Sequence, residues 1–415
     1  MQKRLLKTRN FEKRLGFFEK TAYTARMMKN ETLLTPALLD VISVLNNKAY
    51  LVGGAVRDFL NGQPIKDWDM ATPLCPEQSI DLLTKAGYRI LPTGLKHGTI
   101  TILMPNGSSV ELTTFRKDTE TDGRHAQVSF TQDMKQDALR RDFTINALYM
   151  DRNGTVYDFF HGLTDLKKHR IRFIGAPVDR IQEDALRILR FFRFWGRFGG
   201  KKTPLTALKA CQKTAFLLDR LSAERKRDEL FQILALPNAP HILHFMRQYG
   251  ILRHVISPAT DFKDLLHFMR LEKKQNSSFG VLPRLLLCLK TPEQIPELAL
   301  SNAQKKELTA LHRALHMDLS TYRLRRRAAY LLSPQTVATA FYIRQARHKQ
   351  LLSRSMAHEL NRLTAPVFPV TAADLMQTGI PAGPLLGQKQ KEAEHIWIEM
   401  NFPDKKELVL KALKR

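Results

Sequence analysis

The chain has 415 residues, which is enough for two to four domains with hydrophobic cores, and a formal net charge of +26 from 66 Lys and Arg against 40 Asp and Glu. Such an excess favours a polyanionic partner, nucleic acid before a membrane surface, because basic side chains gain affinity by displacing counterions from phosphates. No apolar run is long enough to span a bilayer, and three widely separated cysteines predict neither a zinc site nor a disulfide framework.

The N-terminal segment is basic, since in residues 1–30 only Glu12 and Glu19 oppose the many Lys and Arg. A transit peptide has a similar composition, but the two acids and the lack of a clear apolar secretory core favour a basic extension of a cytoplasmic protein. Residues 31–48 place apolar side chains near helical spacing and predict a first helix, with Leu33, Leu34, Leu38, Leu39, Ile42 and Leu45.

A short apolar run, Tyr50–Val52, ends in the pair Gly53 and Gly54, which predicts a buried strand, a tight turn and a helix over Ala55–Leu60. A glycine pair lets the backbone approach a ligand, and the free N–H groups of a helix start suit a phosphate. Arg57 lies in the same first turn and could add a charge-assisted contact to a triphosphate. An ordinary strand-to-helix turn with a surface arginine would have the same sequence.

Two carboxylates follow in the segment Asp67-Trp68-Asp69. Alternate residues of a strand point to one face, so Asp67 and Asp69 stand side by side while Trp68 packs on the other face. Like charges at this spacing repel, and a divalent cation compensates them. Oxygen ligands suit Mg²⁺, which takes one or two carboxylates together with substrate phosphates. Solvated turn residues are the alternative for an isolated D-x-D.

The glycine turn with its arginine, followed by D-x-D on the next strand, resembles the signature of the nucleotidyltransferase superfamily that includes DNA polymerase beta. The branch it resembles holds the class II (bacterial-type) CCA-adding enzymes and the poly(A) polymerases. The resemblance implies an α+β fold with a nucleotidyltransferase head of small mixed β-sheet and helices over residues 31–160. All-α neck, body and tail domains are then expected over residues 161–236, 237–330 and 331–415.

Within the head, the pattern predicts a helix over Pro76–Ala86 and strands over Thr99–Met104 and Ser109–Phe115. Alternation places Glu111 on one face of the last strand. If that face carries the two aspartates, Glu111 is a third carboxylate for the metal site or for activating an attacking hydroxyl. A surface strand glutamate is the alternative. The family resemblance, which includes a third acidic residue on this strand, favours the site.

Residues 116–134 show no clear periodicity and are interpreted as a mobile loop. CC-adding enzymes resemble this family but lack part of that loop, so the retained residues 122–125, DGRH, argue against a CC-only enzyme. Residues 91–99, LPTGLKHGT, are similar to the CCA-adding version of the family and lack the basic signature of bacterial poly(A) polymerases.

A second motif, RRDFTINA, spans residues 140–147. Arg141 can hold a phosphate or sugar, while Asp142 and Asn146 can hydrogen-bond to ribose hydroxyls. A charged helix start would also fit these residue types. The stretch closely matches another motif of the same family, and two motifs in family order are more specific than either alone.

Residues 183–195, EDALRILRFFRFW, predict an amphipathic helix. Its core face holds Ile188, Leu189, Phe192 and Trp195. A polar stripe repeats every third residue, with Asp184, Arg187, Arg190 and Arg193.

This stripe is either a solvated basic face or a surface that selects the base. ATP and CTP both present an amino donor beside a ring-nitrogen acceptor, so Asp184 can accept from the amine while Arg187 donates to the ring nitrogen. UTP and GTP present the reverse order, which would leave both side chains unpaired. E-D-x-x-R at this place resembles the motif by which CCA-adding enzymes choose CTP and ATP without a nucleic-acid template. Arg190 and Arg193 match family arginines that contact the nucleotide.

The pattern of the rest of the chain predicts helices, and Ser222 is the predicted N-cap of the first one. Basic clusters at residues 273–274, 323–327 and 411–415 predict, together with the overall charge, a tRNA-binding surface held by phosphate and shape contacts. Each cluster alone would fit a solvated face. Residues 374–387, DLMQTGIPAGPLLG, resemble the tail of the family.

The resemblance thus implies a tRNA nucleotidyltransferase that adds CCA to tRNA 3′ ends from CTP and ATP by Mg²⁺-dependent, two-metal transfer. An A-adding enzyme, a poly(A) polymerase and a non-catalytic RNA-binding protein with this fold are the alternatives. The expected partners are the tRNA 3′ end and the two nucleotides, with no membrane and no stable protein partner.

Overall fold

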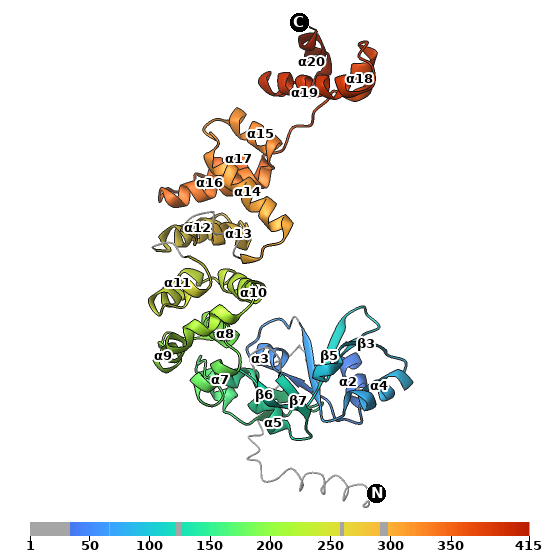
Figure 1. Cartoon of the computed structure of the whole chain (residues 1–415), viewed down its shortest axis with the longest axis vertical. Coiled ribbons are helices and arrows are strands. Elements are labelled where there is room, and N and C mark those ends of the chain that lie inside the picture. Colours follow the sequence, from blue (N-terminus) through green and yellow to red (C-terminus); the bar gives the residue numbers. More distant parts are fainter. Residues whose placement is uncertain (1–33, 66, 122–125, 258–260, 291–297, 415) are drawn as a thin grey trace, which may run out of the picture. The chain divides into compact units, whose positions relative to one another are not determined.

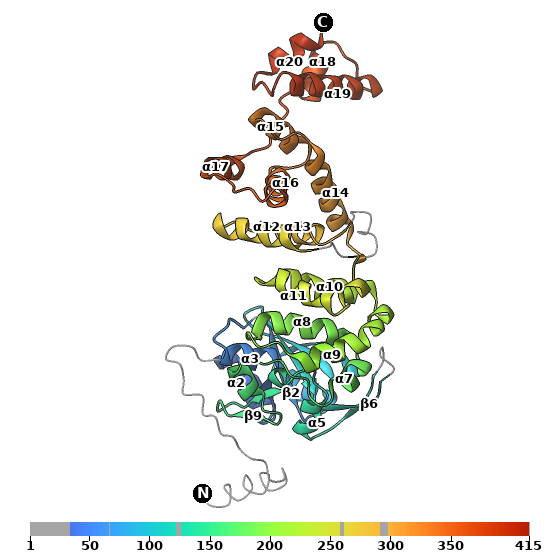
Figure 2. The same ribbon diagram turned by 90° about the vertical axis from the view of Figure 1, so that its left-hand side faces the viewer.

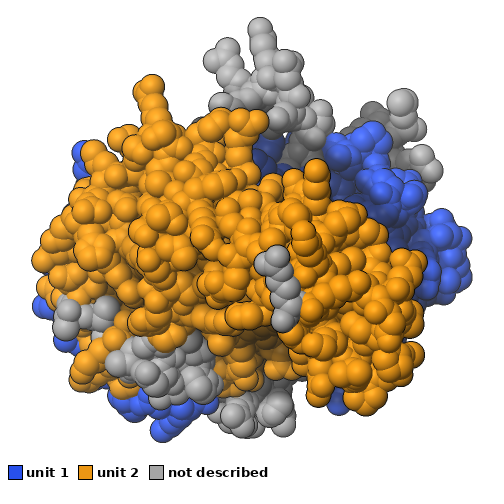
Figure 3. All heavy atoms as spheres, turned by 90° about the horizontal axis from the view of Figure 1, so that it is seen from above, with its two compact units in different colours: residues 1–221 blue, residues 222–415 orange. Residues whose placement is uncertain are grey.

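The computed structural model describes residues 34–65, 67–121, 126–257, 261–290 and 298–414 (Figure 1). The chain forms two compact units, Met1–Leu221 and Ser222–Arg415 (Figure 3). The division falls inside the expected neck, and the four domain boundaries stay predictions. The basic extension expected over residues 1–30 and the loop segment 122–125 lie outside the described residues.

The first unit contains a seven-stranded mixed sheet, in which β2 pairs with β5 in parallel and the other pairs are antiparallel. The spatial order is β3-β4-β5-β2-β1-β8-β9. In chain order the strands are β1 (Tyr50–Val52), β2 (Trp68–Thr72), β3 (Arg89–Gly94), β4 (Thr99–Leu103), β5 (Ser109–Thr114), β8 (Leu148–Met150) and β9 (Val156–Asp158). Strands β3, β8 and β9 were not predicted from the sequence.

One face of this sheet is buried beneath two helices, α2 (Pro36–Val44) and α4 (Pro76–Lys85), drawn beside it in Figure 1. Apolar residues of both helices share one core with the sheet, including Ile42 of α2, Leu83 of α4 and Leu112 of β5. Burial alternates along β5, so Leu112 points into this core. Glu111 therefore lies on the opposite face, which these two helices leave open.

The loop predicted over residues 116–134 is wrong for most of its length. Arg116–Thr121 (β6) and Ala126–Phe130 (β7) pair as an antiparallel two-stranded sheet, and Met134–Leu139 forms helix α5. Residues 116–134 show no hydrophobic period in the sequence, and pairing between backbone groups does not depend on one, so the pairing goes unseen in the sequence pattern.

Helices α7 (Pro177–Glu183), α8 (Leu186–Phe198) and α9 (Leu205–Thr214) follow the sheet in the first unit, after the short α6 (Gly162–Lys167) (Figure 2). The continuous helix predicted over residues 183–195 is therefore wrong at its start. Asp184 has extended backbone angles, φ −150° and ψ 106°, and separates α7 from α8. The core face predicted for α8 is confirmed, since all four of its apolar residues are buried.

In its described residues the second unit consists of helices and the loops that join them, without a strand. Ser222 caps its first helix, as predicted, by accepting a hydrogen bond from the Arg225 N–H at 3.5 Å. The helices are α10 (Ala223–Leu234), α11 (Ala239–Gln248), α12 (Lys263–Lys274), α13 (Val281–Leu286), α14 (Asn302–His316), α15 (Tyr322–Leu331), α16 (Pro334–Arg347), α17 (Arg354–Arg362), α18 (Ala372–Gln377), α19 (Pro384–Glu399) and α20 (Lys406–Leu413). Not one of the helices in the described ranges is both long and apolar enough to cross a membrane.

The basic cluster at residues 323–327 is largely engaged within the protein. Arg325 is buried, donates to the carbonyl oxygens of Leu319 and Ser320, and pairs with Glu359. Arg323 donates to the backbone oxygen of Glu399, and Arg327 forms an ion pair with its carboxylate. Arg325 thus supports the fold of this unit and does not reach a phosphate, which corrects the expectation for this residue.

Candidate active site

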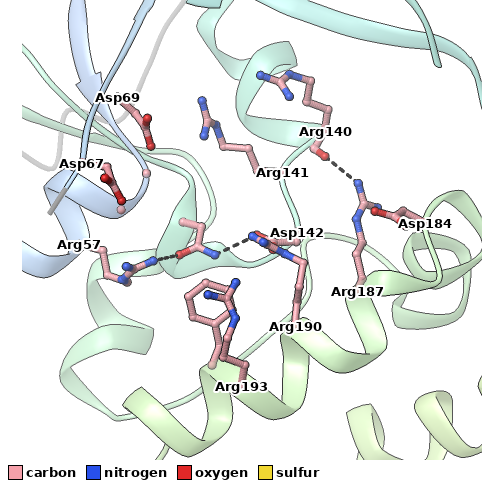
Figure 4. A pocket seen from close by; sticks show the side chains of 14 residues that line it. Arg57, Asp67, Asp69, Arg140, Arg141, Asp142, Asp184, Arg187, Arg190 and Arg193 are labelled. Carbon is pink, nitrogen blue, oxygen red and sulfur yellow. Dashed lines mark hydrogen bonds and ion pairs between the residues drawn. The ribbon is translucent and has the colours of Figure 1, made fainter. Parts of the chain in front are cut away.

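A cavity of about 510 Å³ opens on the uncovered side of the sheet, beside α8. Twelve of the thirteen nucleotide- and metal-binding residues predicted from the sequence line it, and Glu111 does not. In Figure 4, Asp67 and Asp69 lie at one end of the cavity and Asp184 and Arg187 at the other. The lining residues are Gly53, Gly54, Arg57, Asp67, Asp69, Arg140, Arg141, Asp142, Asn146, Asp184, Arg187, Arg190, Arg193 and Phe194.

The acidic end of the cavity rises from the parallel pair of strands. Asp69 of β2 is the register partner of Glu111 on β5, and Asp67 immediately precedes β2. Burial raises the pKa of the Asp69 carboxyl, and the neighbouring charges of Glu111 and Asp67 raise it further. The guanidinium groups of Arg141 and Arg57 act in the opposite direction. Asp67, Asp69 and Glu111 are therefore like-charged oxygen ligands, and the nearby arginines do not fully balance their negative charge.

This donor set fits a hard divalent cation such as Mg²⁺, which prefers oxygen ligands and completes its shell with substrate phosphates and water. In the part of the chain that the structure describes, no three His, Cys, Asp or Glu side chains are gathered closely enough to enclose a metal ion by themselves. A site of two aspartates plus substrate oxygens agrees with both observations. Asp67 is exposed and Asp69 half-buried, so both can reach a ligand in the cavity.

The glycine turn admits an arginine from another element. Gly53 adopts φ +65°, and a Cβ atom added there would lie 3.3 Å from Nη1 of Arg141. A side chain at this position would therefore be strained and would crowd that guanidinium. The structure thus shows Arg141 close to the turn, while Gly54 begins helix α3 (Gly54–Leu60). The predicted approach of a phosphate to the glycine pair stays a prediction.

Arg57 is a buried residue of α3 and not a surface arginine, with 5% of its surface exposed. Its Nε donates to Oδ1 of Asp58 at 2.8 Å, and Nη1 donates to Oδ1 of Asn146. The rings of Phe194 and Phe198, both on α8, lie against its guanidinium at 5.1 and 4.6 Å from Cζ to the ring centres. Hydrogen bonds and aromatic rings together fix the direction in which this cation points.

Arg141 is fixed by a buried carboxylate at the end of α5. Asp137 accepts from Nη2 of Arg141 at 3.2 Å, and Nε of Arg141 donates to the hydroxyl of Tyr149 at 3.0 Å. That hydroxyl donates in turn to Asp137. Burial acts to raise the pKa of the Asp137 carboxyl, but Arg141, Arg140 and the Tyr149 hydroxyl outweigh it and hold the pKa below its usual value. Asp137 is therefore charged at neutral pH.

A chain of hydrogen bonds crosses the floor of the cavity from α3 to α8 (Figure 4). Asn146 accepts from Arg57 and donates from Nδ2 to Oδ1 of Asp142 at 2.9 Å. Oδ2 of Asp142 accepts from Nε of Arg190 at 2.7 Å. Although burial acts to raise it, the pKa of Asp142 is lowered by Arg190 and the hydrogen bond from Asn146. The motif RRDFTINA thus joins the two arginines across the cavity.

The far end of the cavity is built at the break between α7 and α8. Asp184 accepts from the Leu186 N–H at 3.1 Å through one carboxylate oxygen. Nη1 of Arg187 donates to Glu183 at 2.6 Å, and Nη2 donates to the backbone oxygen of Arg140 at 3.0 Å. In the pair predicted to select the base, Asp184 is therefore held by the start of α8, and Arg187 is held by α7 and by the residue that follows α5.

Comparison with known proteins assigns the chain to a family. The family model described as "Poly A polymerase head domain" matches residues 49–172, and that described as "Probable RNA and SrmB- binding site of polymerase A" matches residues 206–263. The mitochondrial CCA tRNA nucleotidyltransferase 1 of Mus musculus is 32% identical over 421 residues, which cover 97% of this chain and 96% of that protein. The chain belongs to the CCA-adding enzyme family.

Other members of the CCA-adding enzyme family agree with this assignment. The CCA-adding enzyme of Levilactobacillus brevis is 32% identical over 395 residues, covering 91% of this chain and 96% of its own. The crystal structure of the Bacillus stearothermophilus CCA-adding enzyme in complex with CTP superimposes with a TM-score of 0.75 at 26% identity, covering 91% of this chain and 97% of that chain. The predicted α+β fold, with a mixed-sheet head followed by helices, is confirmed.

Several residues of this CCA-adding family site were not found from the sequence. Arg140 and Phe194 line the cavity, and Asp137 and Glu183 pair with arginines that do. Arg180 donates to the backbone oxygens of Arg140 and Arg141. Arg140 could have been predicted as a site residue from the sequence, because it is the first residue of the motif RRDFTINA. Glu183 likewise belongs to the motif E-D-x-x-R, whereas Asp137 had no such signal, since a lone Asp in a helical pattern also fits a solvated surface.

Proposed function

We propose that this protein is a tRNA nucleotidyltransferase that adds CCA to the 3′ ends of tRNA from CTP and ATP, without a nucleic-acid template. One observation carries the proposal: a single cavity joins a carboxylate pair that suits a metal ion to an Asp and Arg pair that suits a base. The length between them is lined by arginines that suit a triphosphate and sugar. The two relatives named above are CCA-adding enzymes that match this chain over nearly their whole length, and they support the same activity.

The triphosphate would lie against the arginines next to the glycine turn. Arg57 and Arg141 are both fixed by buried partners, so they offer positive charge with little loss of side-chain entropy on binding. Gly53 and Gly54 carry no Cβ atoms, so the guanidinium groups of Arg141 and Arg57 can stand close to the turn where the phosphates would bind. Asp142 and Asn146, at the floor of the cavity, would hydrogen-bond to the ribose, with Arg190 and Arg193 on the α8 side.

Asp67 and Asp69 would hold Mg²⁺, with Glu111 beside Asp69 adding negative charge or accepting the proton of the attacking hydroxyl. The chemistry that divalent cations supply in transfer of the two-metal type is to lower the pKa of the attacking 3′-hydroxyl and to neutralise charge on the triphosphate. The residues of this chain align the tRNA 3′-hydroxyl with the α-phosphate, and pyrophosphate leaves.

The base would be read by Asp184 and Arg187. The carboxylate can accept from the amino group of cytosine or adenine, and the guanidinium can donate to the adjacent ring nitrogen. A rigid protein surface can therefore replace a template strand. Glu183 and the backbone oxygen of Arg140 hold Arg187 in place, so a base with the reversed donor order would leave unpaired groups in a closed site.

The tRNA would be bound through its backbone and shape, in keeping with the net charge of +26. Two solved structures of CCA-adding enzymes with this fold are complexes, one with tRNA_CCA and one with ATP. A cytoplasmic location stays a prediction, because the relatives include both mitochondrial and bacterial enzymes.

The test is incorporation of CTP and ATP, singly and together with Mg²⁺, into tRNA that ends at the discriminator base, at CC or at CCA. Addition of C, C and A followed by a stop is expected. A single A on the CC-ended tRNA alone would mean an A-adding enzyme, and long A tails would mean a poly(A) polymerase. Binding of tRNA without extension would favour a non-catalytic RNA-binding protein. Asp67→Ala should abolish transfer and leave tRNA binding intact.

A further inference from the structure

Three arginines of the cavity converge on the ring of one phenylalanine. Phe194 of α8 is buried, with 4% of its surface exposed, and it lines the cavity. The Cζ atoms of Arg193, Arg57 and Arg190 lie 4.7, 5.1 and 5.4 Å from its ring centre. The arginines come from two elements, since Arg57 belongs to α3 while Arg190 and Arg193 are one turn and one residue before Phe194.

Gathering three guanidinium groups around one point is unfavourable unless something offsets their mutual repulsion. Arg57 pairs with Asp58 and Arg190 pairs with Asp142. Burial lowers the pKa of Arg57, and the charges of Arg197 and Arg193 lower it further while Asp58 opposes them, so repulsion persists within the group. The face of an aromatic ring carries a partial negative charge and attracts a guanidinium most strongly where water is excluded.

The ring is itself held rigidly. Phe194 stacks on Phe198 one turn later, at 6.0 Å between ring centres and 20° between planes, and it meets Phe143 edge to face at 5.4 Å. Phe198 lies against the guanidinium of Arg57 from a second side. A ring that is held in place gives the three guanidinium groups a fixed surface on which to lie.

We propose that Phe194 is a positioning residue of the nucleotide site, whose ring holds Arg57, Arg190 and Arg193 in the directions needed to bind a nucleoside triphosphate. This inference rests on the function proposed above and adds a residue to it. The ring acts through the arginines and takes no part in bond making. Its aromatic character is the property that matters, because an aliphatic side chain fills the same space without attracting a cation.

The experiment measures binding of a non-hydrolysable CTP analogue to the full-length protein by titration calorimetry, in wild type, Phe194→Leu and Phe194→Tyr. Phe194→Leu should weaken binding about tenfold or more through loss of three cation–ring contacts, and Phe194→Tyr should stay within about threefold of wild type. Phe191→Leu is the matched control. Phe191 is also fully buried in α8, but its ring contacts Phe143, Phe173, Phe192 and Trp195.

Equal weakening by Phe191→Leu and Phe194→Leu would overturn the inference, because it would show that lost packing alone explains the effect. Unchanged binding by Phe194→Leu would overturn it as well. If Phe194→Leu fails to fold, Phe194→Met serves instead, since methionine fills irregular core space and offers no ring. Failure of the wild type to bind CTP or ATP would instead refute the proposed function, so the two failures can be told apart.

Discussion

Asp69 and Glu111 lie directly opposite one another on the neighbouring parallel strands β2 and β5. Their side chains share the face of the sheet that α2 and α4 leave open, and the like charge of Glu111 adds to burial in raising the pKa of Asp69. Like charges directly opposite on a sheet destabilise it by up to about 1 kcal/mol. The head therefore carries an electrostatic cost in its cation-free form at neutral pH, which a bound cation would offset.

Asp69→Asn should raise the melting temperature at pH 7.5 in EDTA by about 2 to 4 °C, because it removes one of these like charges. The pKa of Asp69 is raised on folding, so the folded state binds its proton more tightly than the unfolded chain does. Stability of the wild type should therefore fall as pH rises from the ordinary Asp range through the raised pKa, and Asp69→Asn should lose this dependence. Differential scanning calorimetry between pH 4 and pH 8 measures both effects.

Added Mg²⁺ should raise the melting temperature of the wild type and leave that of Asp69→Asn unchanged. Asp81→Asn is the control, because Asp81 is an exposed carboxylate of α4 that pairs only weakly with Lys85 on the surface. If Asp69→Asn melted below the wild type in EDTA at pH 7.5, its carboxylate would be stabilising the fold and the account of β2 and β5 given above would be wrong.

Asp184→Ala should reduce discrimination against UTP and GTP by about a hundredfold in kcat/KM, mainly by lowering the values for CTP and ATP. The carboxylate also accepts from the Leu186 N–H, so Asp184→Asn, which can keep an oxygen there, separates the loss of base recognition from damage to the start of α8. Asp179→Ala, on the exposed first turn of α7, is the control. An unchanged order of preference among the four nucleotides would refute the role of Asp184.

The parts of this site whose chemistry depends on a local sequence pattern could be predicted from the sequence. Gly53, Arg57 and the pair Asp67 and Asp69 are recognisable because glycine turns and alternating carboxylates have few other uses in one short stretch. The structure then shows why Arg57 could not be described from the sequence. Its partners Asn146 and Phe194 are 89 and 137 residues away, and nothing local distinguishes a buried arginine from a solvated one.

The errors have a similar origin. The period of three from Asp184 to Arg193 looked continuous, yet Asp184 sits at a break in the helix. A two-residue interruption hardly disturbs a hydrophobic pattern, since the apolar residues on either side still face the core. The hairpin of β6 and β7 was missed because pairing between backbone groups leaves no trace in polar sequence.

Asp137→Asn should lower the free energy of unfolding by about 3 kcal/mol, the usual result of removing one partner of a buried ion pair. The carboxylate accepts from Arg140, Arg141, Tyr149 and the Arg116 N–H, and an amide cannot satisfy that many donors. The variant should also raise KM for CTP and ATP, because Arg141 would lose its anchor beside Gly53. Urea unfolding and steady-state kinetics measure the two effects.

The pH dependence distinguishes this residue from Asp69. The folded pKa of Asp137 is lowered, so its stabilising contribution is complete above the ordinary Asp pKa of about 4 and is lost as pH falls towards the lowered value. Asp137→Asn should remove that acid sensitivity. Tyr149→Phe keeps the carboxylate and both arginines and should cost much less. Equal stability of Asp137→Asn and the wild type would show that the network contributes nothing.

Gly162→Ala should destabilise the first unit by about 2 kcal/mol, because the added Cβ would lie 2.2 Å from the carbonyl oxygen of Thr144 and 2.9 Å from its carbon. These are backbone atoms and cannot turn aside as a side chain could. Thr144 begins the short 3₁₀ helix that ends at Asn146, the acceptor for Arg57, so the displacement should also reduce nucleotidyl transfer.

Gly387→Ala is the matched control. A Cβ there meets open space within α19, and the change should leave stability unchanged or raise it by up to about 1 kcal/mol. Urea unfolding followed by fluorescence, together with CTP incorporation, compares the two variants. A Gly162→Ala protein as stable and active as Gly387→Ala would mean that the contact with Thr144 relaxes without moving Asn146, and that the glycine is not required to shape the floor of the cavity.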